Sequence, residues 1–117
     1  MNVLVALALI AFIAVQDSPT IYAPGDGVSV PQVTRQVGAE YTQEAKDHRI
    51  VGKVVLDAVV LSDGRVGDVK VKESLDSVYG LDASAVKAMK QWEFRPGTKD
   101  GTPVAVRIAV DMTFSLR

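Results

Sequence analysis

The C-terminal end of the chain carries its longest regular pattern. From Val104 to Leu116 every second residue is apolar, and the residues between are small, polar or charged. Alternation with a period of two predicts a β-strand with one face in the core and one in solvent. Such a strand extends roughly 43 Å, whereas a globular domain of about 87 residues has a diameter of roughly 31 Å. We therefore expect part of it to overhang, bend or leave backbone groups unpaired, and an unpaired edge accepts a strand from another chain.

A β-hairpin is predicted in the middle of the chain. Residues 54–61 alternate and are rich in β-branched side chains, which is typical of a strand. Ser62-Asp63-Gly64 is a turn sequence, because Asp and Gly tolerate the positive φ of tight hairpins. The chain returns through residues 66–71, where a slip in phase indicates a bulge near Gly67.

Two helices are predicted on either side of this hairpin. The first runs from Thr42 to about Arg49, with Thr42 as its N-cap. The second runs from about Asp82 to Trp92, with Asp82 as its N-cap and apolar residues at helical spacing on one face. With the strands, they predict an α+β fold: a small antiparallel sheet, made of the hairpin and the long C-terminal strand, with two helices packed on one face.

The N-terminal part of the chain differs from the rest in composition. The first fifteen residues are almost wholly apolar and reach roughly 22 Å as a helix, which is short of the ~30 Å core of a bilayer. We interpret residues 1–16 as a signal peptide or a short membrane anchor, with a buried helix as the remaining alternative. Prolines and glycines predict an extended tether over residues 17–30. The folded domain is expected at residues 31–117.

Composition and residue types argue against a catalytic, metal-binding or nucleic-acid-binding site. A net charge of −1 offers no basic field for nucleic acid, and the chain has no cysteine. His48 is the only histidine, and no cluster of metal-ligating side chains accompanies it. The carboxylates are dispersed, and no nucleophile–base pair or phosphate-binding loop is recognisable. We therefore expect no enzymatic activity, no metal and no cofactor.

Several short motifs stand in a fixed order along the chain. They are Gly52-x-Val54, Asp63-Gly64, Leu81-Asp82-x-x-Ala85, Trp92-x-Phe94-x-Pro96, Asp100-Gly101-x-Pro103-Val104 and Phe114-x-Leu116. Each is weak alone, but the ordered set, from about Pro31 to Arg117, resembles the TonB C-terminal domain family.

The resemblance implies a fold and a role. Family members form a small antiparallel sheet with helices on one face, in the order helix, hairpin, helix, strand. It implies a periplasmic domain that binds the TonB-box segment of an outer-membrane receptor as an added strand on the edge of the last strand. The inner-membrane motor ExbB/ExbD energises it. On this reading the backbone of Arg107, Ala109 and Asp111 hydrogen-bonds the partner, and the side chains of this exposed face, including Thr113, contribute to specificity.

Two departures from the family pattern qualify this expectation. The Tyr-Pro motif that usually contacts the receptor falls on Tyr41-Thr42, and since Thr42 replaces the proline, only Tyr41 is carried over as a contact residue. The long proline-rich spacer of energy-transducing members is missing from residues 16–31, which extend roughly 50 Å at most. Energy transduction is therefore less well supported than binding. The alternative is a non-transducing periplasmic assembly module whose edge strand pairs with a second copy in a homodimer.

Overall fold

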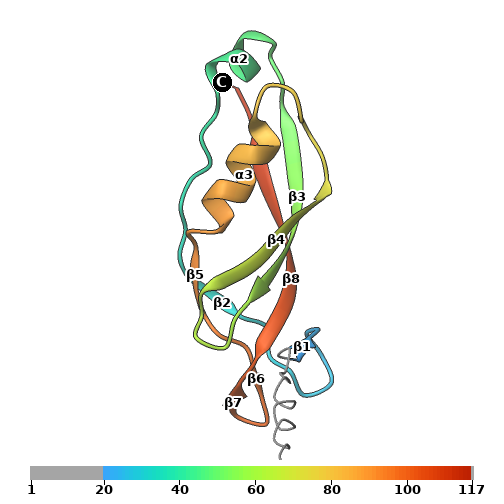
Figure 1. The fold of residues 1–117 in the computed structure, drawn as a ribbon, viewed down its shortest axis with the longest axis vertical. Helices are drawn as coiled ribbons and strands as arrows, with labels where there is room; N and C mark the ends of the chain where they lie inside the picture. The colour runs from blue at the N-terminus through green and yellow to red at the C-terminus, as the bar shows by residue number, and fades with distance from the viewer. Residues whose placement is uncertain (1–19, 117) are drawn as a thin grey trace, which may run out of the picture.

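The computed structural model describes residues 20–116 and confirms the α+β class (Figure 1). The elements are, in order, β1 (Ile21–Tyr22), β2 (Gln32–Arg35), α2 (Gln43–Asp47), β3 (Gly52–Val60), β4 (Val66–Glu73), α3 (Leu81–Met89), β5 (Glu93–Arg95), β6 (Thr98–Lys99), β7 (Thr102–Pro103) and β8 (Ala105–Phe114). The main sheet has four strands in the order β1-β8-β3-β4, and the pairs β2/β5 and β6/β7 form two small sheets.

The long C-terminal strand is the centre of the main sheet. β8 pairs antiparallel with β3 from Gly52 opposite Phe114 to Val60 opposite Val106. The observed strand is thus shorter than the expected residues 104–116 and does not overhang. The reason is that β3 is itself nine residues long, so the sheet is elongated and a globular diameter does not limit it (Figure 1). Of the expected alternatives, unpaired backbone groups are found, on the other edge of β8 within residues 20–116.

The predicted hairpin of β3 and β4 is confirmed. Ala58 lies opposite Val69 and Val60 opposite Val66, so the register shifts beside Gly67, where the phase slip indicated a bulge. Gly64 closes the turn with φ of 89°. A Cβ at this position would lie 2.1 Å from the carbonyl oxygen of Phe94. Only glycine therefore permits β5 to pass this close to the hairpin.

α3 packs on one face of the sheet, and the short α2 lies at one end of the molecule (Figure 1). α3 buries Leu81, Ala85, Ala88 and Met89 against the apolar face of β3. Its start and end differ from the predicted 82–92, because left-handed Gly80 precedes its first residue and the helical hydrogen bonds give way to a turn after Met89.

The N-cap of α2 is confirmed. The Thr42 hydroxyl accepts a hydrogen bond from the backbone N–H of Ala45 at 3.2 Å. It also donates one to the carbonyl of Tyr79 at 2.7 Å. The same side chain therefore begins the helix and attaches it to the loop that precedes α3. The buried Ala45 makes this short helix part of the core.

The structure contains local pairings that sequence patterns did not indicate. β2 and β5 place Val33 opposite Phe94, and β6 and β7 form a short hairpin around Asp100-Gly101. Within the segment expected as a tether, β1 runs parallel to the start of β8. Val28 is buried and bridges to Lys99. Residues 1–16, interpreted as a signal peptide or anchor, lie outside the described residues.

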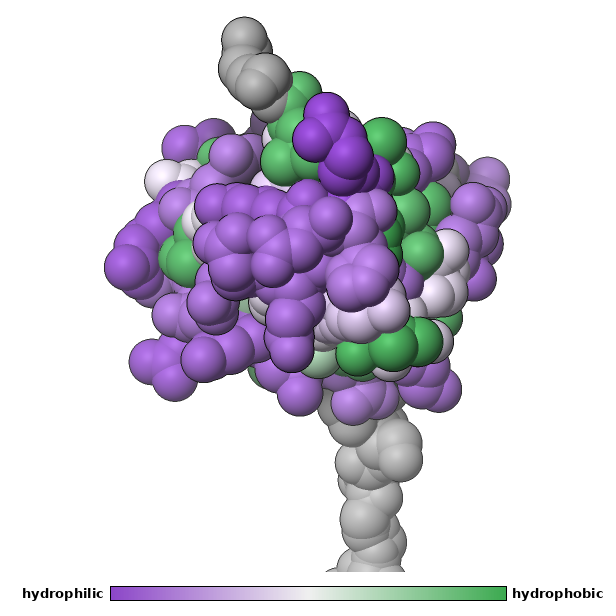
Figure 2. Space-filling model, turned by 90° about the horizontal axis from the view of Figure 1, so that it is seen from above, coloured by the Kyte–Doolittle hydropathy of each residue, from purple (hydrophilic) through white to green (hydrophobic). Residues whose placement is uncertain are grey.

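The end of the molecule that carries α2 is mostly hydrophilic, with hydrophobic residues gathered along one side (Figure 2). Val51 and Val78, in the loops before β3 and α3, are 52% and 77% exposed. No helix within residues 20–116 is long and apolar enough to cross a bilayer.

A buried carboxylate organises the loop between β4 and α3. Asp76 is 7% exposed and accepts hydrogen bonds from the backbone N–H groups of Val78, Tyr79 and Leu81 at 2.8–3.1 Å. Asp82, which does not act as the predicted N-cap, accepts from the N–H groups of Leu75 and Asp76 at 3.0 Å instead. Two carboxylates thus satisfy the backbone donors that this turn would leave unpaired.

Replacing Asp76 tests this role. Burial by itself raises the pKa of the Asp76 carboxyl, but the three backbone donors and nearby His48 outweigh it and hold the pKa below its ordinary value of 3.8. We expect Asp76→Ala to lower the free energy of unfolding at pH 7 by about 3 kcal/mol, because three donors lose a charged acceptor. The measurement is urea denaturation, with the exposed Asp68→Ala as control.

The pH dependence follows from the lowered pKa. A carboxyl with a lower pKa in the folded state stabilises the fold fully above its unfolded-state pKa, and this contribution is lost as pH falls through the folded-state value. The stability difference between wild type and Asp76→Ala should therefore shrink on acidification below about pH 4. An unchanged difference down to pH 2 would contradict this assignment.

Candidate functional site

One edge of β8 is open. Ala105 and Val106 pair with β1 on this edge, and within residues 20–116 no strand pairs with the edge from Arg107 to Phe114. The other edge is fully bonded to β3, so the strand is held rigidly while its open side keeps backbone donors and acceptors at alternate residues. This arrangement is a template for an added strand.

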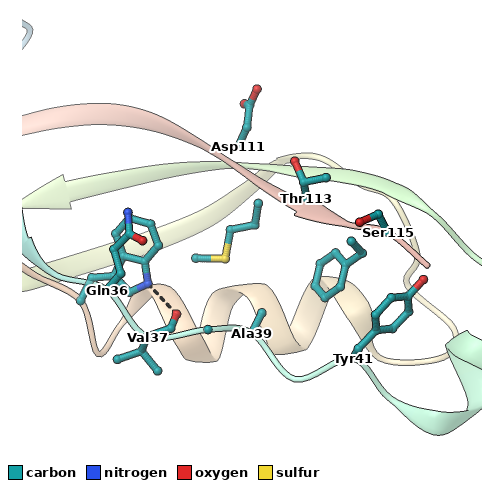
Figure 3. A pocket seen from close by; sticks show the side chains of 11 residues that line it. Gln36, Val37, Ala39, Tyr41, Asp111, Thr113 and Ser115 are labelled. Carbon is teal, nitrogen blue, oxygen red and sulfur yellow. Dashed lines mark hydrogen bonds between the residues drawn. The ribbon is translucent and has the colours of Figure 1, made fainter. Parts of the chain in front are cut away.

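A groove of about 490 Å³ lies beside the C-terminal half of this edge. It is lined by residues 36–39, Tyr41, Trp92 and residues 111–115. The segment from Gln36 to Tyr41 runs along the groove, separated from β8 by the cavity (Figure 3). Because β8 presents an unpaired backbone to this space, the groove combines hydrogen-bonding groups with apolar side chains.

Aromatic contacts fix the wall of the groove. The indole N–H of Trp92 donates to the carbonyl of Val37 at 2.9 Å, drawn as a dashed line in Figure 3. The Tyr41 ring meets Phe114 edge to face, with centroids 5.4 Å apart and planes at 75°. The Tyr41 hydroxyl donates to the carbonyl of Ile50. The contacts of Trp92 and Tyr41 therefore hold the two ends of segment 36–41 in place beside the groove.

The structure brings three of the five predicted contact residues to the groove. Tyr41, Asp111 and Thr113 line it. Arg107 and Ala109 lie further along β8, on the same exposed face, outside the lining.

The charged residues of this face have partners in β3. The Asp111 side chain points away from the cavity (Figure 3) and pairs with Lys53 at 3.2 Å. Arg107 approaches Asp57 at 3.8 Å. Exposed ion pairs of this kind contribute roughly 0–1 kcal/mol each, so both side chains remain available to a partner.

Sequence reasoning missed the wall of the groove. Residues 36–39 carry no periodic pattern, and Trp92 was expected only at the end of the second helix and in a family motif. One signal could have indicated this wall. A tryptophan N–H near the core needs a hydrogen-bond acceptor, and the irregular segment before the first helix can provide one.

The described residues give no sign of a metal or acid–base centre. No group of three or more His, Asp or Glu side chains within residues 20–116 is arranged to hold a metal ion. The ring of His48 stacks on Tyr79 with centroids 4.1 Å apart, and its Nδ1 lies 2.9 Å from the carbonyl oxygen of Glu44. These contacts give the lone histidine a structural environment.

The fold and groove define a small α+β domain whose last strand is bonded on one side and open on the other. Comparison with known proteins identifies the family to which this domain belongs. The family model described as Gram-negative bacterial TonB protein C-terminal matches residues 37–116. The chain therefore belongs to the TonB C-terminal domain family.

Individual relatives agree with this assignment. Protein TonB of Vibrio cholerae serotype O1 is 37% identical over 87 residues, which cover 72% of this chain. This chain spans only 34% of that relative's length. The solution NMR structure of the Pseudomonas aeruginosa TonB C-terminal domain matches with a TM-score of 0.55 and 25% identity, over 80% of this chain and 92% of that one.

The wall of the groove should loosen when its indole hydrogen bond is removed. We expect Trp92→Phe to keep most of the apolar contact but to leave the Val37 carbonyl without its donor, at a cost of about 1 kcal/mol. Amide exchange in residues 36–41 should accelerate more than exchange in β3. The control is Tyr79→Phe, which removes a ring hydroxyl outside the groove. Uniform acceleration across the domain would contradict a local role.

Proposed function

We propose that this domain binds a short peptide of an outer-membrane receptor, the TonB-box segment, as a strand added to the open edge of β8. The observation that carries the proposal is that edge itself, which no strand of residues 20–116 pairs from Arg107 to Phe114 and which a groove borders. An eight-residue partner strand would span roughly 27 Å. Main-chain hydrogen bonds supply the affinity in this mode, and alternate side chains supply the specificity.

The proposal includes the setting that family membership suggests. In it, the domain works in the periplasm, exported or anchored to the inner membrane by the apolar residues 1–16. The ExbB/ExbD motor supplies the energy that the receptor uses for transport. Support comes from the family match over residues 37–116 and from the likeness to Protein TonB.

The backbone assignment can be tested by amide exchange. We expect the N–H groups of Arg107, Ala109 and Asp111 to face the open edge, and those of Ile108 and Val110 to bond β3. In the free domain the first set should exchange faster. A synthetic TonB-box peptide should then protect it. Peptide binding without new protection anywhere in residues 107–114 would refute strand addition.

A proline pair sharpens the test. Proline has no N–H, so it is tolerated where that group faces solvent and disrupts a ladder where the group is bonded. Ala109→Pro should leave the domain folded and abolish peptide binding, whereas Val110→Pro should destabilise the sheet. If Ala109→Pro folds and binds the peptide as tightly as the wild type, the proposed edge is not the binding site.

Tyr41 is proposed as the contact at the far end of the groove. Its ring lines the cavity and packs on Phe114, so a peptide beside residues 111–115 would meet it. We expect Tyr41→Ala to weaken peptide binding about tenfold, in the range of a buried aromatic contact. Tyr41→Phe, which keeps the ring, should bind within about threefold of wild type. Calorimetric titration measures both, and equal affinities for the two variants would remove Tyr41 from the site.

The same edge also favours the alternative, a homodimer in which two copies of β8 pair. Sedimentation across a concentration series separates the two functions. A monomer at high concentration that binds the peptide supports receptor binding. A dimer that dissociates in Ala109→Pro and ignores the peptide supports the assembly role.

A further inference from the structure

The sheet has a second open edge. β4 ends the strand order β1-β8-β3-β4, and within residues 20–116 no strand pairs with its outer side. This edge lies at the opposite end of the sheet order from β1. It takes no part in the proposed peptide site on β8.

An apolar groove of about 390 Å³ runs between this edge and α3. Val71 of β4 lies opposite core-facing Leu56, and so points to the helix side of the sheet, where it is 38% exposed. Ala83 and the half-buried Val86 of α3 line the other side. The incomplete burial of Val86 leaves an apolar surface beside the edge of β4 that no described strand pairs.

The charges that line this groove are unbalanced. Lys87 and Lys90 lie one turn apart on the helix side. Within residues 20–116 neither pairs with a carboxylate. The single carboxylate of the lining, Asp82, already accepts hydrogen bonds from the N–H groups of Leu75 and Asp76. The groups free to meet a ligand are therefore positive.

We propose that the β4 edge and this groove bind an extended peptide segment whose helix-facing side chains, every second residue, are apolar and acidic in turn. Paired with β4, such a strand directs every second side chain toward α3. Apolar side chains would cover Val71 and Val86, and carboxylates would meet the ammonium groups of Lys87 and Lys90. The domain would then hold two different peptides on the two edges of one sheet.

A protective edge is the competing explanation. Lys70 and Lys72 are exposed on β4, and lysines on an edge strand discourage pairing between sheets. A purely protective edge would bind no peptide of either charge. The positive groove next to the strand predicts that the domain binds an acidic peptide more tightly than a basic one.

The test compares two synthetic heptapeptides, Val-Ser-Glu-Ser-Val-Ser-Glu and the same sequence with lysine for glutamate, because this spacing puts the Val and Glu side chains on one face of the strand. The acidic peptide should protect amides of residues 66–73 and bind more weakly as salt rises. The double variant Lys87→Glu/Lys90→Glu should bind it about tenfold more weakly, through two lost exposed pairs. The control Arg95→Glu/Lys99→Glu has the same net charge and should bind within about twofold of wild type.

The variant Ala109→Pro keeps this test separate from the function proposed for β8. If that variant is folded, protection of residues 66–73 should persist in it, whatever becomes of TonB-box binding. Four outcomes would each overturn the proposal. They are amide protection confined to β8, equal affinity for the two peptides, an equal loss of affinity in both charge variants, and the absence of binding.

Discussion

The hydrogen-bonded pairing of β3 with β8 is the contact on which the rest of the structure depends. It joins residues far apart in the sequence, from Gly52 with Phe114, 62 positions apart, to Val60 with Val106, 46 positions apart. Such a long-range contact has a high entropic cost of closure, which the burial of the facing apolar side chains must offset. Once it forms, it fixes the face on which α3 packs and places the open edge of β8 beside segment 36–41.

The sequence predicted the longer elements, β3, β4, α3 and β8, because each carries its own periodic signal. The alternation in Val104–Leu116 and the turn at Asp63-Gly64 are local and depend on few partners. Both helices were predicted from caps and helical spacing, and the α+β class followed from the strands and helices together. The estimate of an overhanging strand failed because it assumed a round domain, whereas the length of β3 was already visible in residues 54–61.

The wall of the groove was harder to predict for a physical reason. Segment 36–41 has no ladder or helix of its own. Its position depends on single contacts such as the bond from Trp92 to Val37 and the packing of Tyr41 on Phe114. The role of Asp82 was missed for a similar reason: a carboxylate at the start of a helix predicts a cap, and only the path of the preceding loop turns it toward Leu75 and Asp76.

The parallel pairing of β1 with the start of β8 has a mechanical consequence. Because β1 runs in the same direction as β8, the described chain enters the sheet at the end where β8 begins, with β1 lying along the axis of β8 (Figure 1). Hydrogen bonds between antiparallel strands are perpendicular to that axis. A load along the axis of β8 therefore strains many of its hydrogen bonds to β3 together in shear. The sheet resists such a load better than one that would peel one strand away bond by bond.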